Sequence, residues 1–411
     1  MTGTTTTTDV PAHLDSGRAW RVAAGAGIAS GTAFGSAYTF GPFSDAMAED
    51  FGSGRGPTAL VFGITLLLFF GLGIVSGPLA DRVGARRLVV GGGILIAGGL
   101  ALTSQVGTIY LGYLTIGGGV GVGGGMIASP MYSTAGGWFL RRRALAMGLV
   151  ASGNGLGTLL LVPFAESLID ANGWRSAYLR LAVVDIVLFT VAALLIARPP
   201  GLVAPPPAIE HMKAIMRIDA FRIMFVTGLL FSVSLFIAFA FIVDFATEEG
   251  IASDRAALLV GIIGATSIIG RLGITSLSGR LSSVRLLQGC LAAQPVAFLL
   301  WLLSDGSYPV LVAFAITMGI AYGGFVALGP EVAAVLFGTL GLGSTIGLTF
   351  LGAGLGGLLG PTTAGFLADA SDGQVVPIVF ALTASVLTVL LSSRLPTRQV
   401  VDPADLVGAG S

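Results

Sequence analysis

Long apolar segments alternate with short polar ones along the whole chain. Twelve of these segments are long enough, as helices of about 20 residues, to cross the roughly 30 Å hydrocarbon core of a bilayer. They lack the two-residue alternation of a barrel strand, so we predict membrane-spanning helices. The predicted spans cover residues 20–42, 58–80, 88–106, 109–137, 144–169, 175–197, 221–246, 256–277, 285–303, 308–336, 342–368 and 375–394.

One longer polar stretch, RPPGLVAPPPAIEHMKAIMRIDAFR, separates the sixth span from the seventh. Its prolines cannot continue a helix, and its charges favour water. We therefore predict an all-α membrane protein made of two six-helix bundles. The expected parts are a disordered cytosolic tail (1–19), an N-terminal bundle (20–197), a cytosolic linker (198–220), a C-terminal bundle (221–394) and a cytosolic tail (395–411).

The two halves share an internal repeat. Residues 148–171 (GLVASGNGLGTLLLVPFAESLIDA) align without gaps on residues 347–370 (GLTFLGAGLGGLLGPTTAGFLADA), with identity at 12 of 24 positions. The alignment pairs Gly148 with Gly347 and Asp170 with Asp369, which equates span 5 with span 11. Parallel repeats of this kind are typical of transporters that hold their substrate between two halves near the bilayer midplane.

The charged residues predict the orientation. Arginine-rich loops follow spans 2 and 4, and further basic residues occupy the linker and the C-terminal tail. They are Arg82, Arg86, Arg87, Arg141, Arg142, Arg143, Arg198, Lys213, Arg217, Arg222, Arg394 and Arg398. Basic loops stay in the cytosol, so we expect a multi-pass protein of the cytoplasmic membrane with both termini cytosolic.

Composition narrows the function classes. Charged residues make up 10% of the chain, against about 25% in soluble domains, and the net charge is zero. Nothing in the sequence indicates nucleic-acid binding or a nucleophile–base pair, so we expect no enzyme and no cofactor. The single cysteine, Cys290, excludes an intrachain disulfide and argues against a cysteine-based metal site. His13 and His211 lie outside the predicted spans, and we assign them no role in proton transfer.

A conformational latch is predicted in the loop after span 2, GPLADRVGARR (77–87). Its glycines allow two helix ends to approach closely, its acid can meet a neighbouring arginine or helix end, and its arginines anchor at the membrane surface. The residues are Gly77, Asp81, Arg82, Gly84, Arg86 and Arg87. The motif resembles the loop signature of the major facilitator superfamily. The equivalent loop in the second half has Gly279 in place of the acid.

A second resemblance concerns spans 4 to 6 and 10. The stretches GGGVGVGGGMIASPMYSTAGGWFLRRRALAMGLVASGNGLGTLLL, GWRSAYLRLA and MGIAYGGFVALGPEVAAVLFG are similar to the monocarboxylate transporter family, including its bacterial and oxalate/formate-type members. The resemblance implies transport of a small organic monocarboxylate. The chain departs from the family at Ala128 and Ser129, where a tyrosine is frequent, and at Phe43, where animal members carry a lysine.

Arg271 is the only charged residue between Ala256 and Leu277. A charge at bilayer depth costs roughly 2.5–3.5 kcal/mol on insertion scales, so a charged residue there requires a structural or functional explanation. One hypothesis is that the side chain snorkels to the cytosolic surface, about 9 Å away. The other is that its planar fork binds a carboxylate between the halves. The resemblance implies the second role, since family members carry this arginine in a Gly-Arg context; their accompanying aspartate falls near Ser267 here.

Further candidates follow from the spans and the resemblance. Tyr322 and Asn154 are substrate-binding candidates, and Glu248, Asp244 and Glu331 are proton-coupling candidates. Packing is the structural alternative for Tyr322, a hydrogen bond between helices for Asn154, and solvation in an external loop for Glu248. Asp185, inside span 6, could pair with Arg180.

The prediction is a monomeric secondary transporter in the lipid bilayer, in which the two halves rock around a fixed site. Its partners would be a small carboxylate and a proton. An exporter of apolar compounds, an anion exchanger, and a sensor that binds without translocating remain alternatives.

Overall fold

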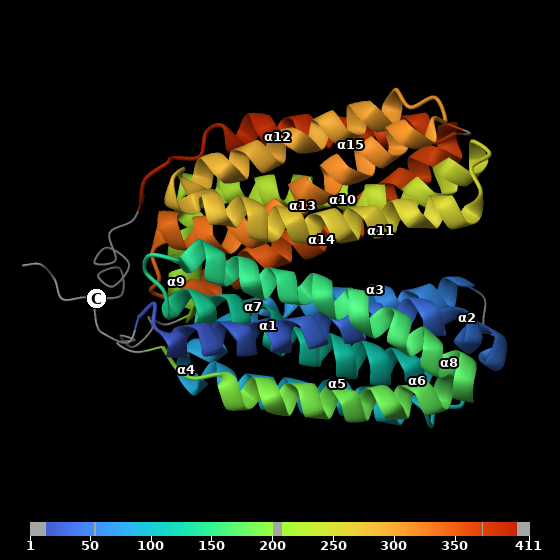
Figure 1. Cartoon of the computed structure of the whole chain (residues 1–411), viewed down its shortest axis with the longest axis horizontal. Helices are drawn as coiled ribbons and strands as arrows, with labels where there is room; N and C mark the ends of the chain where they lie inside the picture. Colours follow the sequence, from blue (N-terminus) through green and yellow to red (C-terminus); the bar gives the residue numbers. More distant parts are fainter. Residues whose placement is uncertain (1–13, 53–54, 200–207, 372, 401–411) are drawn as a thin grey trace, which may run out of the picture.

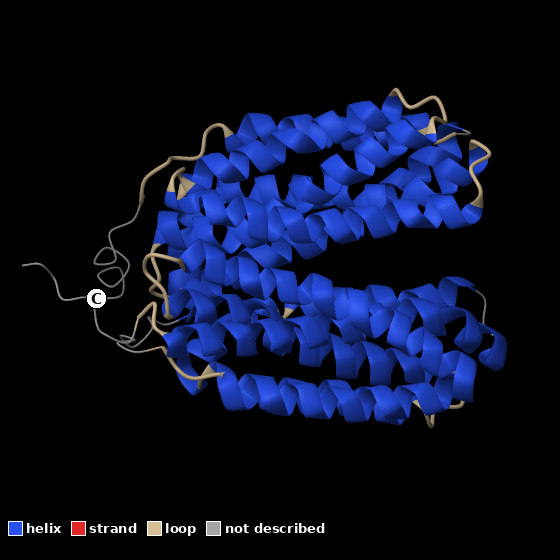
Figure 2. Cartoon of the chain, in the orientation of Figure 1, coloured by secondary structure: helices blue, strands red, loops and turns tan. Residues whose placement is uncertain are grey.

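A computed structural model describes residues 14–52, 55–199, 208–371 and 373–400. These residues form helices joined by short loops, and no strand occurs among them (Figure 2). The N-terminal helices are α1 (Gly17–Tyr38), α2 (Phe40–Phe51), α3 (Arg55–Gly71), α4 (Gly73–Val83), α5 (Ala85–Thr103), α6 (Ile109–Gly112), η1 (Tyr113–Gly121), α7 (Val122–Gly137) and α8 (Arg143–Leu195). The C-terminal helices are α9 (Ala208–Arg217), α10 (Asp219–Glu248), α11 (Ser253–Ile269), η2 (Gly270–Ile274), η3 (Leu277–Gly279), α12 (Ser283–Leu302), α13 (Tyr308–Phe337), α14 (Leu342–Ser371) and α15 (Val375–Ser392).

Each predicted span lies on a helix or a short series of helices. Nine helices of the described chain are long and apolar enough to cross a membrane, and α3 with α4, bent by 44°, makes a tenth. The longest, α8, has 53 residues and covers spans 5 and 6, which are divided at Gly173, whose φ is 75°. α1 covers most of span 1. It begins at Gly17, inside the predicted tail, and residues 1–13 of that tail lie outside the described residues.

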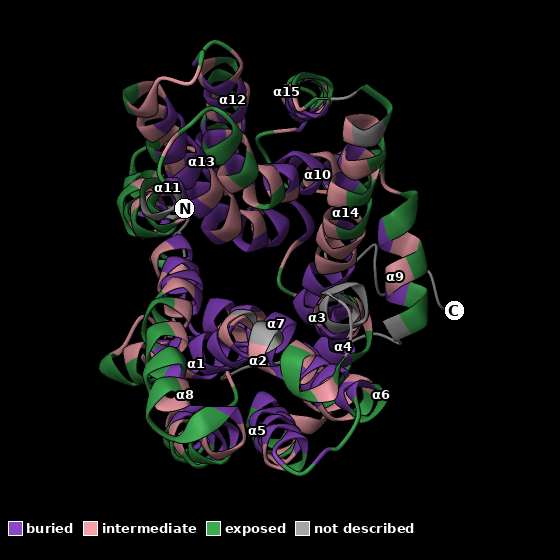
Figure 3. Cartoon of the chain, turned by 90° about the vertical axis from the view of Figure 1, so that its right-hand side faces the viewer, coloured by how far each residue is buried: buried purple, intermediate pink, exposed green. Residues whose placement is uncertain are grey.

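The helices form two groups, α1–α8 and α10–α15 (Figure 1). The groups lie close together at the end where α4 and α9 lie, and their ribbons diverge toward the end where α2 lies. Figure 3, viewed from the α2 end, shows exposed residues along the outer side of α8 and on α15. Many of these are large apolar residues, such as Leu160, Leu194 and Leu390. An apolar outer surface of this kind suits contact with lipid.

Glycines on the repeated helices show that the halves are built alike. Gly157 on α8 packs against α1, where a Cβ would lie 1.9 Å from the carbonyl oxygen of Gly31. Its repeat partner Gly356 on α14 packs against α10, where a Cβ would lie 2.4 Å from the carbonyl oxygen of Leu229. Small residues allow helices to approach closely in lipid, where van der Waals packing drives association. The packed pair α8 and α1 in the N-terminal half therefore corresponds to the packed pair α14 and α10 in the C-terminal half.

Another repeated pair of glycines joins the halves to each other. A Cβ at Gly148 on α8 would lie 3.0 Å from the carbonyl oxygen of Arg271, and one at Gly347 on α14 would lie 2.0 Å from the carbonyl oxygen of Gly73. Each half thus presents the start of its repeated helix to the other half. These contacts position Arg271 beside α8.

The linker contains a helix that the sequence did not predict. The short helix α9 packs against α10 and α14 in the C-terminal half. His211 on α9 is 2% exposed, and its Nε2 lies 3.4 Å from Oγ1 of Thr345. Burial lowers the pKa of His211 below its usual range, so the ring is neutral at neutral pH. The sequence predicted a solvated linker and did not predict that α9 packs against the C-terminal half.

Candidate functional site

Arg271 lies in the contact between the halves. It belongs to η2, a single π-helical turn that follows α11, and such turns are frequent at functional sites. The side chain is 2% exposed, and its Nη1 donates a hydrogen bond of 2.9 Å to the carbonyl oxygen of Ala151 on α8. The guanidinium is therefore buried against the other half in this conformation, where the snorkelling hypothesis would place it at a membrane surface.

The charge of Arg271 has only neutral partners in the described residues. The guanidinium carbon lies 5.2 Å from the centre of the Tyr322 ring on α13, and Nε has no hydrogen-bond partner there. None of the ion pairs found in the described chain includes Arg271. Carbonyl and ring contacts stabilise a cation less well than a carboxylate does. The described contacts therefore give the guanidinium no compensating negative charge.

Asn154 belongs to the same neighbourhood. Its Nδ2 donates a hydrogen bond of 3.1 Å to the hydroxyl oxygen of Tyr132, and both residues are buried. Tyr132 is close enough to Arg271 and Tyr322 for electrostatic interaction. Oδ1 of Asn154 has no partner in the described residues, so it remains an acceptor. Sequence reasoning missed Tyr132, although it lies within the span 4 stretch that carries the family resemblance.

Gly155, which directly follows Asn154 on α8, leaves space for the guanidinium. A Cβ at Gly155 would lie 2.3 Å from Nη1 of Arg271. No larger residue fits there without moving the arginine.

The three acidic candidates occupy different environments. Glu331 on α13 is 7% exposed, its Oε2 has no partner in the described chain, and it lies within electrostatic range of Arg143 on α8. Asp244 and Glu248 are exposed at the C-terminal end of α10. Among the described contacts, only Glu331 faces a charge across the boundary between the halves.

Asp185 has a different partner from the one predicted. Its Oδ2 accepts a hydrogen bond of 2.7 Å from Ser36 on α1, whereas Arg180 donates to Asn172. The possible pair of Asp185 with Arg180 therefore does not form. Asp185 is fully buried, and its partner Ser36 belongs to the same half.

The residues predicted as a latch occupy the end of the molecule where the halves meet. Gly77 on α4 packs against α14, where a Cβ would lie 2.0 Å from the carbonyl oxygen of Gly343. Asp81 is half-buried, and its backbone carbonyl accepts a hydrogen bond of 3.1 Å from Arg198. Gly84 ends α4 with φ at 90°, which favours glycine. Arg82, Arg86 and Arg87 are exposed.

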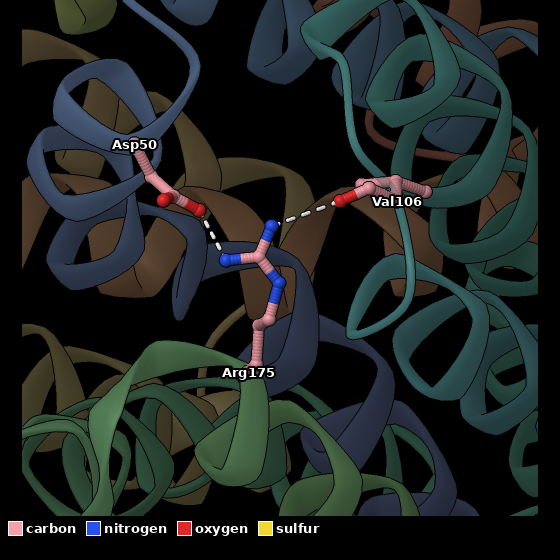
Figure 4. A network of polar contacts seen from close by, with 3 residues as sticks. All are labelled: Asp50, Val106 and Arg175. Carbon is pink, nitrogen blue, oxygen red and sulfur yellow. Dashed lines mark hydrogen bonds and ion pairs between the residues drawn. The ribbon is translucent and has the colours of Figure 1, made fainter.

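A second polar network ties the N-terminal half together at the α2 end (Figure 4). Arg175 on α8 forms an ion pair with Asp50 on α2 and donates a hydrogen bond of 3.0 Å to the carbonyl oxygen of Val106. Its guanidinium also lies 4.2 Å from the centre of a Trp174 ring. This arginine comes from the stretch GWRSAYLRLA, and its contacts link α2, the loop before α6 and α8.

Two repeated helical halves that meet along one interface are the architecture of a class of membrane transporters, in which the substrate binds between the two bundles. The sequence model of the Major Facilitator Superfamily, a protein family, matches residues 26–306 of the chain. The chain is 31% identical to monocarboxylate transporter 3 of Rattus norvegicus, over 90% of this chain and 78% of that protein. It is also 31% identical to monocarboxylate transporter 11 of Mus musculus, over 93% of this chain and 89% of that protein.

Solved structures agree on the fold. The transporter FucP in its outward conformation covers 91% of this chain and 98% of its own, with a TM-score of 0.73 and 16% identity. A bacterial homologue of the iron transporter ferroportin, in its outward-facing state, has a TM-score of 0.75 and 14% identity, covering 93% of this chain and 100% of its own. The chain belongs to the Major Facilitator Superfamily, and within it to the family of the monocarboxylate transporters. It is a transporter and not an enzyme.

Proposed function

We propose that this transporter moves a small organic monocarboxylate across the cytoplasmic membrane together with a proton. The buried guanidinium of Arg271 carries the proposal, because it lies between the halves with no acidic partner in the described residues. A planar fork suits a carboxylate, which can accept two parallel hydrogen bonds. The names of the relatives support the same substrate class.

The mechanism that we propose is compensation of charge. An arginine without an anion disfavours any movement that takes it further from water, since an uncompensated buried charge costs several kcal/mol. A bound carboxylate neutralises Arg271, and the two bundles can then rock around the site. Tyr322 and Asn154 would orient the substrate from opposite halves.

Glu331 is the proton-coupling residue in this proposal. As a carboxylate, it lies within electrostatic range of Arg143 of the other half, and in this proposal the attraction between them favours the conformation in which the halves meet here. Protonation removes the negative charge and weakens the attraction. A carboxyl group whose surroundings change with the conformation can link proton binding to transport, and exposed Glu248 lacks such a partner among the described contacts.

Replacement of Glu331 by glutamine tests the coupling. In liposomes with the purified protein, a pH gradient should drive accumulation of labelled pyruvate or lactate by the wild type. Glu331→Gln should lose most of this accumulation and keep exchange of internal for external substrate, whereas Glu248→Gln should behave as the wild type. If only Glu248→Gln lost the pH-driven accumulation, Glu248 and not Glu331 would be the proton-coupling residue. If accumulation by the wild type did not depend on the pH gradient, the protein would be an exchanger or a uniporter.

We propose that both termini face the cytosol, on the distribution of arginines. Single cysteines at Glu249 and Arg86, both exposed, test this orientation in intact cells. An impermeant maleimide should label Glu249→Cys from outside and leave Arg86→Cys unlabelled until the cells are opened. The wild type is the control, because its only cysteine, Cys290, is 4% exposed. The reverse pattern of labelling would invert the proposed orientation.

A further inference from the structure

Aromatic rings from both halves form a continuous series close to Arg271. The ring centres of Phe34 and Phe70 lie 6.1 Å apart, those of Phe70 and Phe350 lie 6.1 Å apart, and those of Phe350 and Tyr132 lie 5.7 Å apart. The series crosses from α1, α3 and α7 to α14. We call these four rings, together with Tyr38 and Tyr322, the aromatic cluster.

The cluster is connected to the cation. Tyr322 lies directly beside the guanidinium, with 5.2 Å between the guanidinium carbon and the ring centre. Tyr38 stacks at 6.5 Å on Phe34 and is within electrostatic range of both Arg271 and Tyr322. The cation and the rings are therefore components of one site.

Most rings of the cluster keep some of their surface uncovered. Phe34, Tyr38, Phe70, Tyr322 and Phe350 are half-buried. In contrast, neighbouring Phe69 is 1% exposed, as expected for a ring that only fills the core. Phe70 and Phe350 contact each other across the boundary between the halves, so their surfaces face the interior and not only lipid.

The described contacts place several polar groups beside this cluster. They include the guanidinium of Arg271, the hydroxyls of Tyr38, Tyr132 and Tyr322, and the amide of Asn154. A ligand that matches them has one carboxylate for the arginine and a flat apolar body for the rings. Aromatic pairs prefer edge-to-face or offset stacking, which adds to the gain from burial alone.

We infer that the preferred substrates are aryl-substituted monocarboxylates, and that smaller aliphatic acids bind more weakly. The inference rests on the proposed function, because it assumes that Arg271 takes the carboxylate. Each ring–ring contact changes affinity about two- to tenfold, so an aryl group that meets two rings should gain on the order of tenfold or more.

Pyruvate and phenylpyruvate provide the test, since they share a 2-keto acid and differ by one phenyl group. Calorimetry on the purified full chain should give a dissociation constant for phenylpyruvate at least about tenfold lower than for pyruvate. An aliphatic probe, 4-methyl-2-oxopentanoate, should fall between them, because it adds apolar surface without a ring. Equal affinities for pyruvate and phenylpyruvate would overturn the inference and leave the proposed function intact. If none of the three acids bound, the proposed function would fail with it.

Phe350→Leu tests the contribution of the ring. Leucine keeps an apolar side chain and loses the aromatic face, so binding of phenylpyruvate should weaken several-fold and binding of pyruvate should change little. Phe366→Leu is the matched control on the same helix, because that ring is 72% exposed and outside the cluster. A similar loss for both acids in Phe350→Leu would contradict a specificity role. The wild-type ratio remains decisive if the variant does not fold.

Discussion

Arg271→Lys is expected to weaken carboxylate binding on the order of tenfold or more, although the positive charge is kept. Lysine offers a point charge without the planar fork, so a carboxylate loses one of its two parallel hydrogen bonds. Hydrogen bonds to charged groups contribute about 1.5–3 kcal/mol each. The carbonyl of Ala151 already takes one donor of Arg271, and lysine has fewer donors left for a substrate after making the same contact.

The measurement is the dissociation constant of pyruvate and phenylpyruvate for purified, folded protein. Arg280→Lys is the matched control, since Arg280 is exposed beyond the end of the same helical segment. It should bind both acids as the wild type does. Wild-type affinity in Arg271→Lys would instead mean that Arg271 only joins the halves through Ala151.

Gly77→Ala is expected to destabilise the contact between α4 and α14. The added Cβ would lie 2.0 Å from the carbonyl oxygen of Gly343, whereas real Cβ contacts essentially never fall below 3.0 Å. The helices must therefore separate by about 1 Å, the difference between these distances. Overpacking of this kind costs about 1–3 kcal/mol, which shifts the balance between two conformations about 5- to 150-fold.

Spin labels can measure this shift. Labels at Arg86 and Arg280, which are exposed on different halves, report the separation at the α4 end in a Cys290→Ala background. Gly77→Ala should move the distance distribution to longer values and slow transport. Gly71→Ala is the control, because a Cβ at Gly71 meets no atom within 4 Å. An unchanged distribution in Gly77→Ala would mean that this contact does not limit the closed conformation.

The sequence predicted the fold well because each span has its own signal. An apolar run of sufficient length specifies a membrane helix by its own chemistry, and the repeat of Gly148 and Gly347 predicted that the halves are alike. Arg271 could be singled out for the same reason, since one charge in an apolar run has a cost. These inferences need only local residues.

The missed features depend on contacts between distant segments. The hydroxyl of Tyr132 meets Asn154 only after α7 and α8 pack together, and Ser36 reaches Asp185 across 149 positions of sequence. His211 is buried because α14 covers it, although its own segment is polar. Arg180 was the possible partner of Asp185 within the same span, and packing against α1 gave the acid Ser36 instead.

The covalent connection between the bundles is fastened at both ends. Pro199 packs against Gly137 of the N-terminal half, and α9 is held on the C-terminal half by His211. Nine peptide units join Pro199 to Ala208, and a fully extended chain of that number spans at most about 30 Å. This link holds the two halves in one molecule through its docked ends, whereas Gly77 and Arg271 join the halves directly, at the carbonyl oxygens of Gly343 and Ala151.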